Sequence, residues 1–133
     1  MKEFMFFIRK QSKSETTLSP DQHQKFLKSC ESYINKLKDD GKLISAQPIE
    51  WTVKIISGTK EVWTEAPFDE RKEIIAGYYH LLAKDLDEAI TIAKANPEFQ
   101  YNRDTRIEIR PIKTKEEKTT FVYPTATTTN EVK

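Results

Sequence analysis

Residues 64–99 read TEAPFDERKEIIAGYYHLLAKDLDEAITIAKANPEF, and this stretch decides the fold. A turn at residues 66–68 leads into an apolar run from Ile74 to Leu82, which is rich in β-branched and aromatic residues and too short for a surface helix. Gly77 interrupts the run, and a glycine inside a strand indicates either a β-bulge or the close approach of a packed helix. The pattern therefore predicts a turn followed by a strand.

A helix is expected directly after this strand. Asp85 is a suitable N-cap, and Glu88 lies three residues later, which is the spacing of a capping box. Pro97 ends the helix because proline cannot continue the helical hydrogen-bond ladder. The predicted buried face consists of Leu86, Ala89, Ile90 and Ala93. Its small residues would let the helix lie close to a sheet.

The N-terminal part of the chain predicts another strand and helix. Glu3 to Arg9 is an aromatic-rich run that fits a central strand covered on both faces. Ser19 and Gln22 have the spacing of a capping box, Pro20 suits the first helical position, and Gly41 ends the helix. The apolar stripe of this helix contains Phe26, Leu27, Cys30, Tyr33, Ile34 and Leu37.

Shorter β-rich segments account for the rest of the folded part. Leu43–Gln47 is expected to be an edge strand because a proline follows it. Residues 51–57 and 60–64 predict a hairpin around a tight turn at Gly58-Thr59. Arg106–Ile112 alternates between apolar and charged residues, which is typical of a strand with one buried face.

The resulting order is β-α-β, a hairpin, then β-α-β. It predicts an α+β fold, a ferredoxin-like split βαβ protomer with an extra hairpin. Two helices would cover one sheet face, and a second copy would close the other by stacking sheet against sheet, so we expect a homodimer with a partly barrel-like space between the sheets. Residues 1–113 are the predicted domain and residues 114–133 a flexible C-terminal tail. In the alternative, the apolar patch at residues 121–124 docks on the second subunit.

Composition argues against several classes of function. The 133 residues include 22 basic and 21 acidic ones, for a net charge of +1, so no charge excess steers the chain onto nucleic acid or an anionic membrane. Cys30 is the lone cysteine and the N-terminal apolar run is short, so we expect a cytoplasmic protein. Three glycines and two histidines, without a metal-binding or phosphate-binding motif, predict no cofactor and no metal.

Five segments stand in a characteristic order: EAPF at 65–68, KE at 72–73, AGYY at 76–79, DLDEA at 85–89 and IEIRPI at 107–112. Together they make residues 1–113 resemble the YCII-related family, in the branch marked by a DGPF motif. The resemblance implies a dimeric α+β barrel built on a ferredoxin-like protomer, in agreement with the pattern of elements. It implies no particular reaction, because the biochemical function of that family is largely unassigned.

The sequence departs from the family pattern at two positions where the family carries polar residues that could take part in chemistry. The Asp-Gly of the DGPF motif is Glu65-Ala66 here, which moves the carboxylate by one methylene and removes the access of glycine to positive φ. Shorter family members carry a His–Asp pair proposed as catalytic, with the histidine in the first helix. The matching position falls near Ser29, so we do not transfer that role to His23, which we expect to be a solvated surface residue.

Polar side chains on the predicted strands are the candidates for a functional site. On an ideal strand Tyr78 and His80 share a face, and they would point into the inter-sheet space if Gly77 met a helix. His80 is then either a proton-transfer or ligand-binding group or a satisfied interface histidine. Glu65 would serve as an acid or base only if it were buried. The candidate catalytic residues are His80 and Glu65, and the candidate ligand-binding residues are Tyr78, Glu108, Arg110, Arg9 and Phe68.

Two functions from different classes follow from this pattern. The first is a pocket for a small molecule between the sheets of a homodimer, with or without acid/base catalysis. The second is a non-enzymatic dimerising module that binds a protein or a metabolite as a regulator. Polar and aromatic groups expected to face the same space favour the first, and the sequence leaves open whether the protein is an enzyme.

Overall fold

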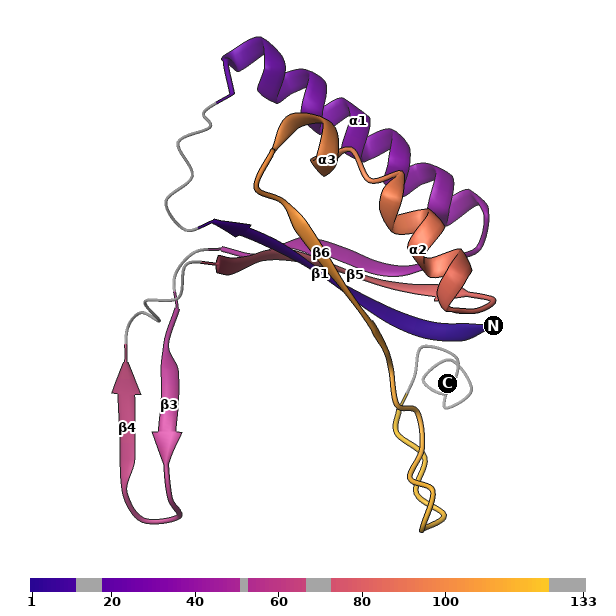
Figure 1. Ribbon diagram of the computed structural model, residues 1–133. Coiled ribbons are helices and arrows are strands. Elements are labelled where there is room, and N and C mark those ends of the chain that lie inside the picture. Colours follow the sequence, from indigo (N-terminus) through magenta and orange to yellow (C-terminus); the bar gives the residue numbers. More distant parts are fainter. Residues whose placement is uncertain (12–17, 51–52, 67–72, 125–133) are drawn as a thin grey trace.

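The computed structural model describes residues 1–11, 18–50, 53–66 and 73–124. Helices cover one face of a four-stranded antiparallel sheet in this α+β protein, and a two-stranded hairpin stands apart from that sheet (Figure 1). The elements are β1 (Lys2–Gln11), α1 (Pro20–Asp39), β2 (Leu43–Pro48), β3 (Ile55–Gly58), β4 (Trp63–Ala66), β5 (Glu73–Ala83), α2 (Leu86–Lys94), α3 (Glu98–Tyr101) and β6 (Arg106–Pro111). The predicted order is confirmed, with the one-turn helix α3 added.

The strands of the main sheet lie in the order β2-β5-β1-β6, with antiparallel neighbours throughout. β1 is therefore central and β2 lies at an edge, as the sequence predicts. The register pairs Phe4 with Leu81 and Phe6 with Tyr79 across the two central strands. Because side chains alternate along a strand, this register fixes which face each residue of β1 and β5 occupies.

The core lies between the sheet and the helices. Phe4, Phe6 and Ile8 of β1 are buried there, together with Tyr79, Leu81 and Ala83 of β5. Ala89 and Ala93 of α2 are also buried, which lets α2 lie close to the sheet, as expected, but Leu86, predicted for the same buried face, is 47% exposed. Full burial of each large apolar side chain contributes about 1.5–3 kcal/mol. β1 is not buried on both faces, however: Met5 and Phe7 remain half-buried because no described helix covers their side.

The ends of the two longer helices follow the sequence signals closely. Ser19 and Gln22 form the reciprocal capping box. Gly41 has φ +70°, and the N–H groups of Gly41 and Lys42 donate to the last carbonyls of α1, as in a Schellman motif. Asp85 caps α2 by accepting from the Glu88 N–H, but the Glu88 carboxylate accepts from the N–H of residue 84 instead of completing the box.

Gly77 marks a bulge and a close approach of two strands, not a helix contact. The β1–β5 register passes from the pair of Ile8 and Gly77 to the pair of Arg9 and Ile75, so one extra residue bulges from β5. A Cβ on Gly77 would lie 3.0 Å from the carbonyl oxygen of Gln47 in β2. The bulge alternative is therefore confirmed, and the helix-contact alternative is wrong.

The predicted hairpin is present, but its first strand begins at Ile55 and its turn is longer than expected; residues 51–52 of the predicted strand lie outside the described residues. β3 and β4 pair from Ile55–Ala66 to Gly58–Trp63, and the four residues 59–62 connect them instead of a two-residue turn at Gly58-Thr59. Hydrogen bonds in both directions between Thr59 and Val62 close the loop. The hairpin extends away from the helices, which leaves Trp63 64% exposed (Figure 1).

The described end of the chain folds back on itself. Lys115 pairs with Val122 in an antiparallel bridge, and the Tyr123 hydroxyl donates to the Glu116 carboxylate. Phe121 and Val122 are more than half exposed. This turn, like the β3–β4 hairpin, extends on the side of the sheet opposite the helices (Figure 1). The domain division at residue 113 and the flexibility of the tail stay predictions.

The burial of Leu81 and the exposure of Leu86 predict how much each leucine contributes to the free energy of unfolding. Leu81→Ala should lower the free energy of unfolding by about 3–5 kcal/mol, because Leu81 is fully buried and the substitution leaves a cavity. Leu86→Ala is the matched control, since Leu86 is 47% exposed and should cost about 1 kcal/mol or less. Urea denaturation measures both, and equal losses would contradict the arrangement of the core.

Candidate functional site

One face of the sheet is covered by no helix of the described residues, and we call it the open face. The strand register and the side-chain contacts put on it Glu3, Met5, Phe7, Arg9, Ser45, Tyr78, His80, Glu108 and Arg110. Five of these residues were site candidates from the sequence. The side chains of β6 also divide between the two faces as expected, because Ile107 and Ile109 pack against the core on the helix side.

His80 and Glu3 form the closest polar pair on the open face. His80 Nε2 lies 2.7 Å from Glu3 Oε1, and the two side chains are only 21% and 13% exposed. In the tautomer with the proton on Nε2, this N–H donates to the carboxylate, and Nδ1 is left as the unprotonated nitrogen of the ring. A pair of this kind can take up and return a proton. Glu3 was not among the sequence candidates, because only the register of β1 against β5 reveals its partner.

Arg9, Glu108 and Arg110 form a second polar group on neighbouring strands. Arg9 Nε lies 2.8 Å from Glu108 Oε1, and Arg110 Nη1 lies 3.5 Å from Glu108 Oε2. These partly exposed pairs contribute about 1 kcal/mol or less each to stability. Both guanidinium groups have N–H donors beyond those that Glu108 accepts. The group is therefore able to hold an anion next to the face.

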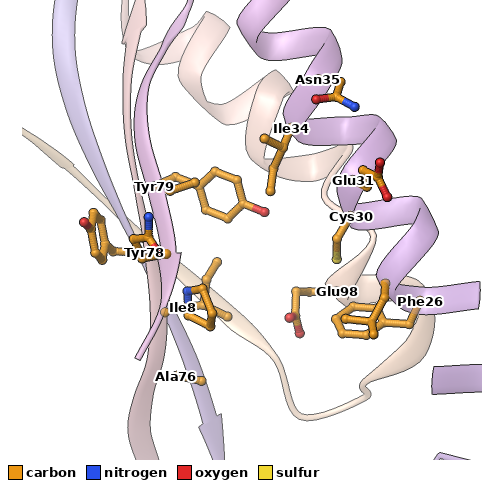
Figure 2. Close-up of a pocket in the computed structure, with 15 residues that line it drawn as sticks. Ile8, Phe26, Cys30, Glu31, Ile34, Asn35, Ala76, Tyr78, Tyr79 and Glu98 are labelled. Carbon is orange, nitrogen blue, oxygen red and sulfur yellow. The ribbon is translucent and has the colours of Figure 1, made fainter. Parts of the chain in front are cut away.

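Tyr78 lies on the open face between His80 and the edge strand β2. Its hydroxyl lies 3.1 Å from Ser45 Oγ of β2, and Tyr78 stands two residues before His80 on the same face of β5. Its ring lies on the opposite side of the sheet from that of Tyr79 (Figure 2). The shared face of Tyr78 and His80, predicted from strand alternation, is thus observed, although β2 and not a helix lies against Gly77.

The remaining candidates do not join this group. Glu65 lies on β4 with a side chain 65% exposed, 3.9 Å from the Lys54 ammonium. The burial that an acid or base role requires is absent, because the hairpin extends away from the main sheet. Phe68 lies outside the described residues. His23 is exposed in the first turn of α1, as expected.

A recess of about 390 Å³ lies on the other side of the sheet, between α1 and strands β1, β2 and β5 (Figure 2). We call it the α1 cavity. Its large apolar walls are Ile8, Phe26, Ile34 and Tyr79, and its small lining residues are Cys30, Ala46, Ala76 and Gly77. The sequence analysis missed it. Small residues facing the α1 stripe are its only signal, and they come together only through the register of β2 and β5.

The α1 cavity places Cys30 in an apolar environment. Burial, with a smaller effect of the Glu98 charge, raises the pKa of the Cys30 thiol from 9.0 to about 11. The nearby Lys10 ammonium offsets part of this rise. The thiol is therefore protonated at neutral pH and is not an activated nucleophile.

Neither a membrane-spanning helix nor a metal cluster occurs in the part of the chain that the structure describes. None of its helices is long and apolar enough to cross a bilayer. Over the same ranges, no three His, Cys, Asp or Glu side chains gather closely enough to hold a metal ion.

Comparison with known proteins assigns the ordered sequence motifs to a family. The family model of the YCII-related domain matches residues 3–114, a span that contains the described helices and strands apart from Lys2 at the start of β1. No curated protein matches the sequence. The match supports the relationship inferred from the ordered motifs.

The buried environment of Cys30 predicts that its thiol is alkylated slowly. At pH 8 the native protein should react with iodoacetamide about 100-fold more slowly than the chain unfolded in urea, because a pKa two units higher leaves about 100-fold less thiolate. The rate should rise as the pH approaches 11. Mass spectrometry follows the single modification, and equal native and unfolded rates at pH 8 would refute the burial of this group.

Proposed function

This chain belongs to the YCII-related family, and we propose that two copies bind a small molecule between their open faces. The observation that carries the proposal is the His80–Glu3 pair, which lies largely buried on the face that no described helix covers. In this proposal residues 1–113 are a ferredoxin-like protomer, and two protomers form a cytoplasmic dimeric α+β barrel.

Apolar surface on the open side supports the dimer. Met5 and Phe7 lie at the centre of the sheet but are only half-buried in a single chain. A second open face would remove this surface from water, which stabilises the dimer. The β3–β4 hairpin and the turn at residues 114–123 extend on the same side and expose further apolar side chains (Figure 1). These two arms would contact the partner beside the sheet.

The polar groups of the open face support a role in proton transfer. His80 Nδ1 would take a proton from the bound molecule while Glu3 stabilises the imidazolium. Arg9 and Arg110 would hold an anionic group of that molecule, and the Tyr78 hydroxyl would donate a hydrogen bond to it. The substrate class is therefore a small acid with a labile proton.

The alternative is a dimeric binding module without chemistry. It is supported by the mutual satisfaction of the polar groups, since Arg9 bonds Glu108 and Tyr78 bonds Ser45. A regulator of this kind would bind the same class of ligand in the same space and release it unchanged. The two functions differ only in whether the ligand is consumed.

A substitution that places a charge on the open face tests the proposed dimer. Phe7→Glu should convert the dimer to a folded monomer, because each interface would bury an unpaired carboxylate. Phe99→Glu is the matched control: Phe99 is exposed on α3, and its variant should stay dimeric. Light scattering after size exclusion at micromolar concentration measures the mass, and circular dichroism checks folding. A monomeric wild-type protein, or a dimeric Phe7→Glu variant, would contradict the proposal.

The two histidines provide a matched test of proton transfer. His80→Gln should slow the consumption of a substrate in a mixture of small organic acids by at least about 100-fold, because it removes the base. His23→Gln changes the same residue type at an exposed position and should leave the rate unaltered. Mass spectrometry of the mixture over time gives the rates. Binding without consumption by the wild-type protein would favour the regulatory module.

A further inference from the structure

We infer that the α1 cavity is a second ligand site, for a small, uncharged and mainly apolar molecule with one hydrogen-bond donor. A monocyclic aromatic alcohol is a representative of this class. The inference goes beyond the proposed function, because the α1 cavity lies on the opposite side of the sheet from the open face and needs no partner subunit.

The size and the walls of the α1 cavity fit such a molecule. A volume of about 390 Å³ falls at the lower end of the range of small-molecule pockets. Ile8, Phe26, Ile34 and Tyr79 surround it with apolar surface, and Figure 2 shows Tyr79 and Ile34 on facing walls.

Contacts on both sides of Cys30 hold α1 away from the sheet. One turn before Cys30, the Phe26 ring packs on Tyr101 at 5.4 Å between centroids. Nearly one turn after it, the Tyr33 hydroxyl donates to the Ile92 carbonyl at 2.6 Å, and the Tyr33 ring packs edge-on against Tyr79. Between these two supports the small side chains of Cys30, Ala46 and Ala76 line the space. The helix therefore cannot close the space without breaking one of them.

Glu98 supplies a fixed hydrogen-bond acceptor at one wall. Its Oε2 atom lies 2.9 Å from Lys10 Nζ and accepts from Asn102 Nδ2 at 3.0 Å and from Thr105 Oγ1 at 3.5 Å. Asn96 Oδ1 accepts the Glu98 backbone N–H, which fixes the start of α3. These three contacts are all made with Oε2, and Oε1 is the second acceptor atom of the same carboxylate. A ligand hydroxyl would bond there.

The charges around the α1 cavity select an uncharged ligand. Lys10 neutralises Glu98, so a cation gains little attraction there. An anion would meet the carboxylates of Glu98 and of Glu31, which lies on the lining from α1. The cavity thus differs from the open face, where Arg9 and Arg110 favour an anionic group.

The mouth gives access without rearrangement of the sheet. Leu27, Glu31 and Asn35 follow one another at every fourth position along α1 and form one rim. Gln47 and Pro48, at the end of the edge strand β2, form the other. A ligand would enter between helix and edge strand.

Three probes of similar shape test the class of ligand by calorimetric or NMR titration of the wild-type protein. 4-Ethylphenol should bind saturably, whereas 4-ethylbenzoate should bind at least tenfold more weakly because of its charge. Ethylbenzene should be weaker than the phenol because it lacks the donor for Glu98. Bound 4-ethylphenol should also protect Cys30 from alkylation. Failure of 4-ethylphenol to saturate at millimolar concentration, or tighter binding of the benzoate, would overturn the inference.

Filling the α1 cavity tests its location. Ala46→Leu and Cys30→Leu add bulk from opposite walls and should each weaken binding of 4-ethylphenol at least tenfold without lowering Tm. Ala95→Leu makes the same change at an exposed position and should bind as the wild type does. Phe7→Glu should also bind normally, since it alters only the open face. Undiminished binding by both filled variants would overturn the assignment, and loss of binding in Phe7→Glu would place the probe at the open face instead.

Discussion

Packing of Phe4, Phe6 and Ile8 against Tyr79 and Leu81, beneath the helices, is the interaction on which the rest of the structure depends. It fixes the register of the two central strands, and a shift by one residue would turn these side chains out of the core. Because the alternation is strict, the same packing that forms the core presents every second residue of both strands on the other face.

Chemistry and packing are therefore coupled along β1 and β5. Glu3 and His80 meet because the residues beside them are held in the core, and no loop is needed to bring them together. The same strand contributes Tyr79 and Gly77 to the α1 cavity on the helix side. One sheet thus supports two environments of opposite character, a charged open face and an apolar recess. A ligand at one site would feel the other only through the central strands.

Local signals predicted the elements, whereas contacts between distant residues had to be observed. The cap at Ser19, the glycine end at Gly41 and the alternation of β6 depend on neighbours in the sequence, and all were predicted correctly. The partner of His80 depends on register over 77 residues, and no local pattern contains it. The exposure of Glu65 follows from a hairpin that leaves the sheet, which depends on tertiary structure alone.

The central claim is that a second copy covers the open face, and intermolecular NOEs in a sample of mixed ¹³C-labelled and unlabelled chains test it most directly. The account predicts NOEs from the Met5 methyl group of labelled chains to protons of unlabelled chains. It predicts none from Leu86, which is exposed on α2 at the helix side. Intermolecular NOEs at Leu86 but not at Met5, or none at either residue, would contradict the account.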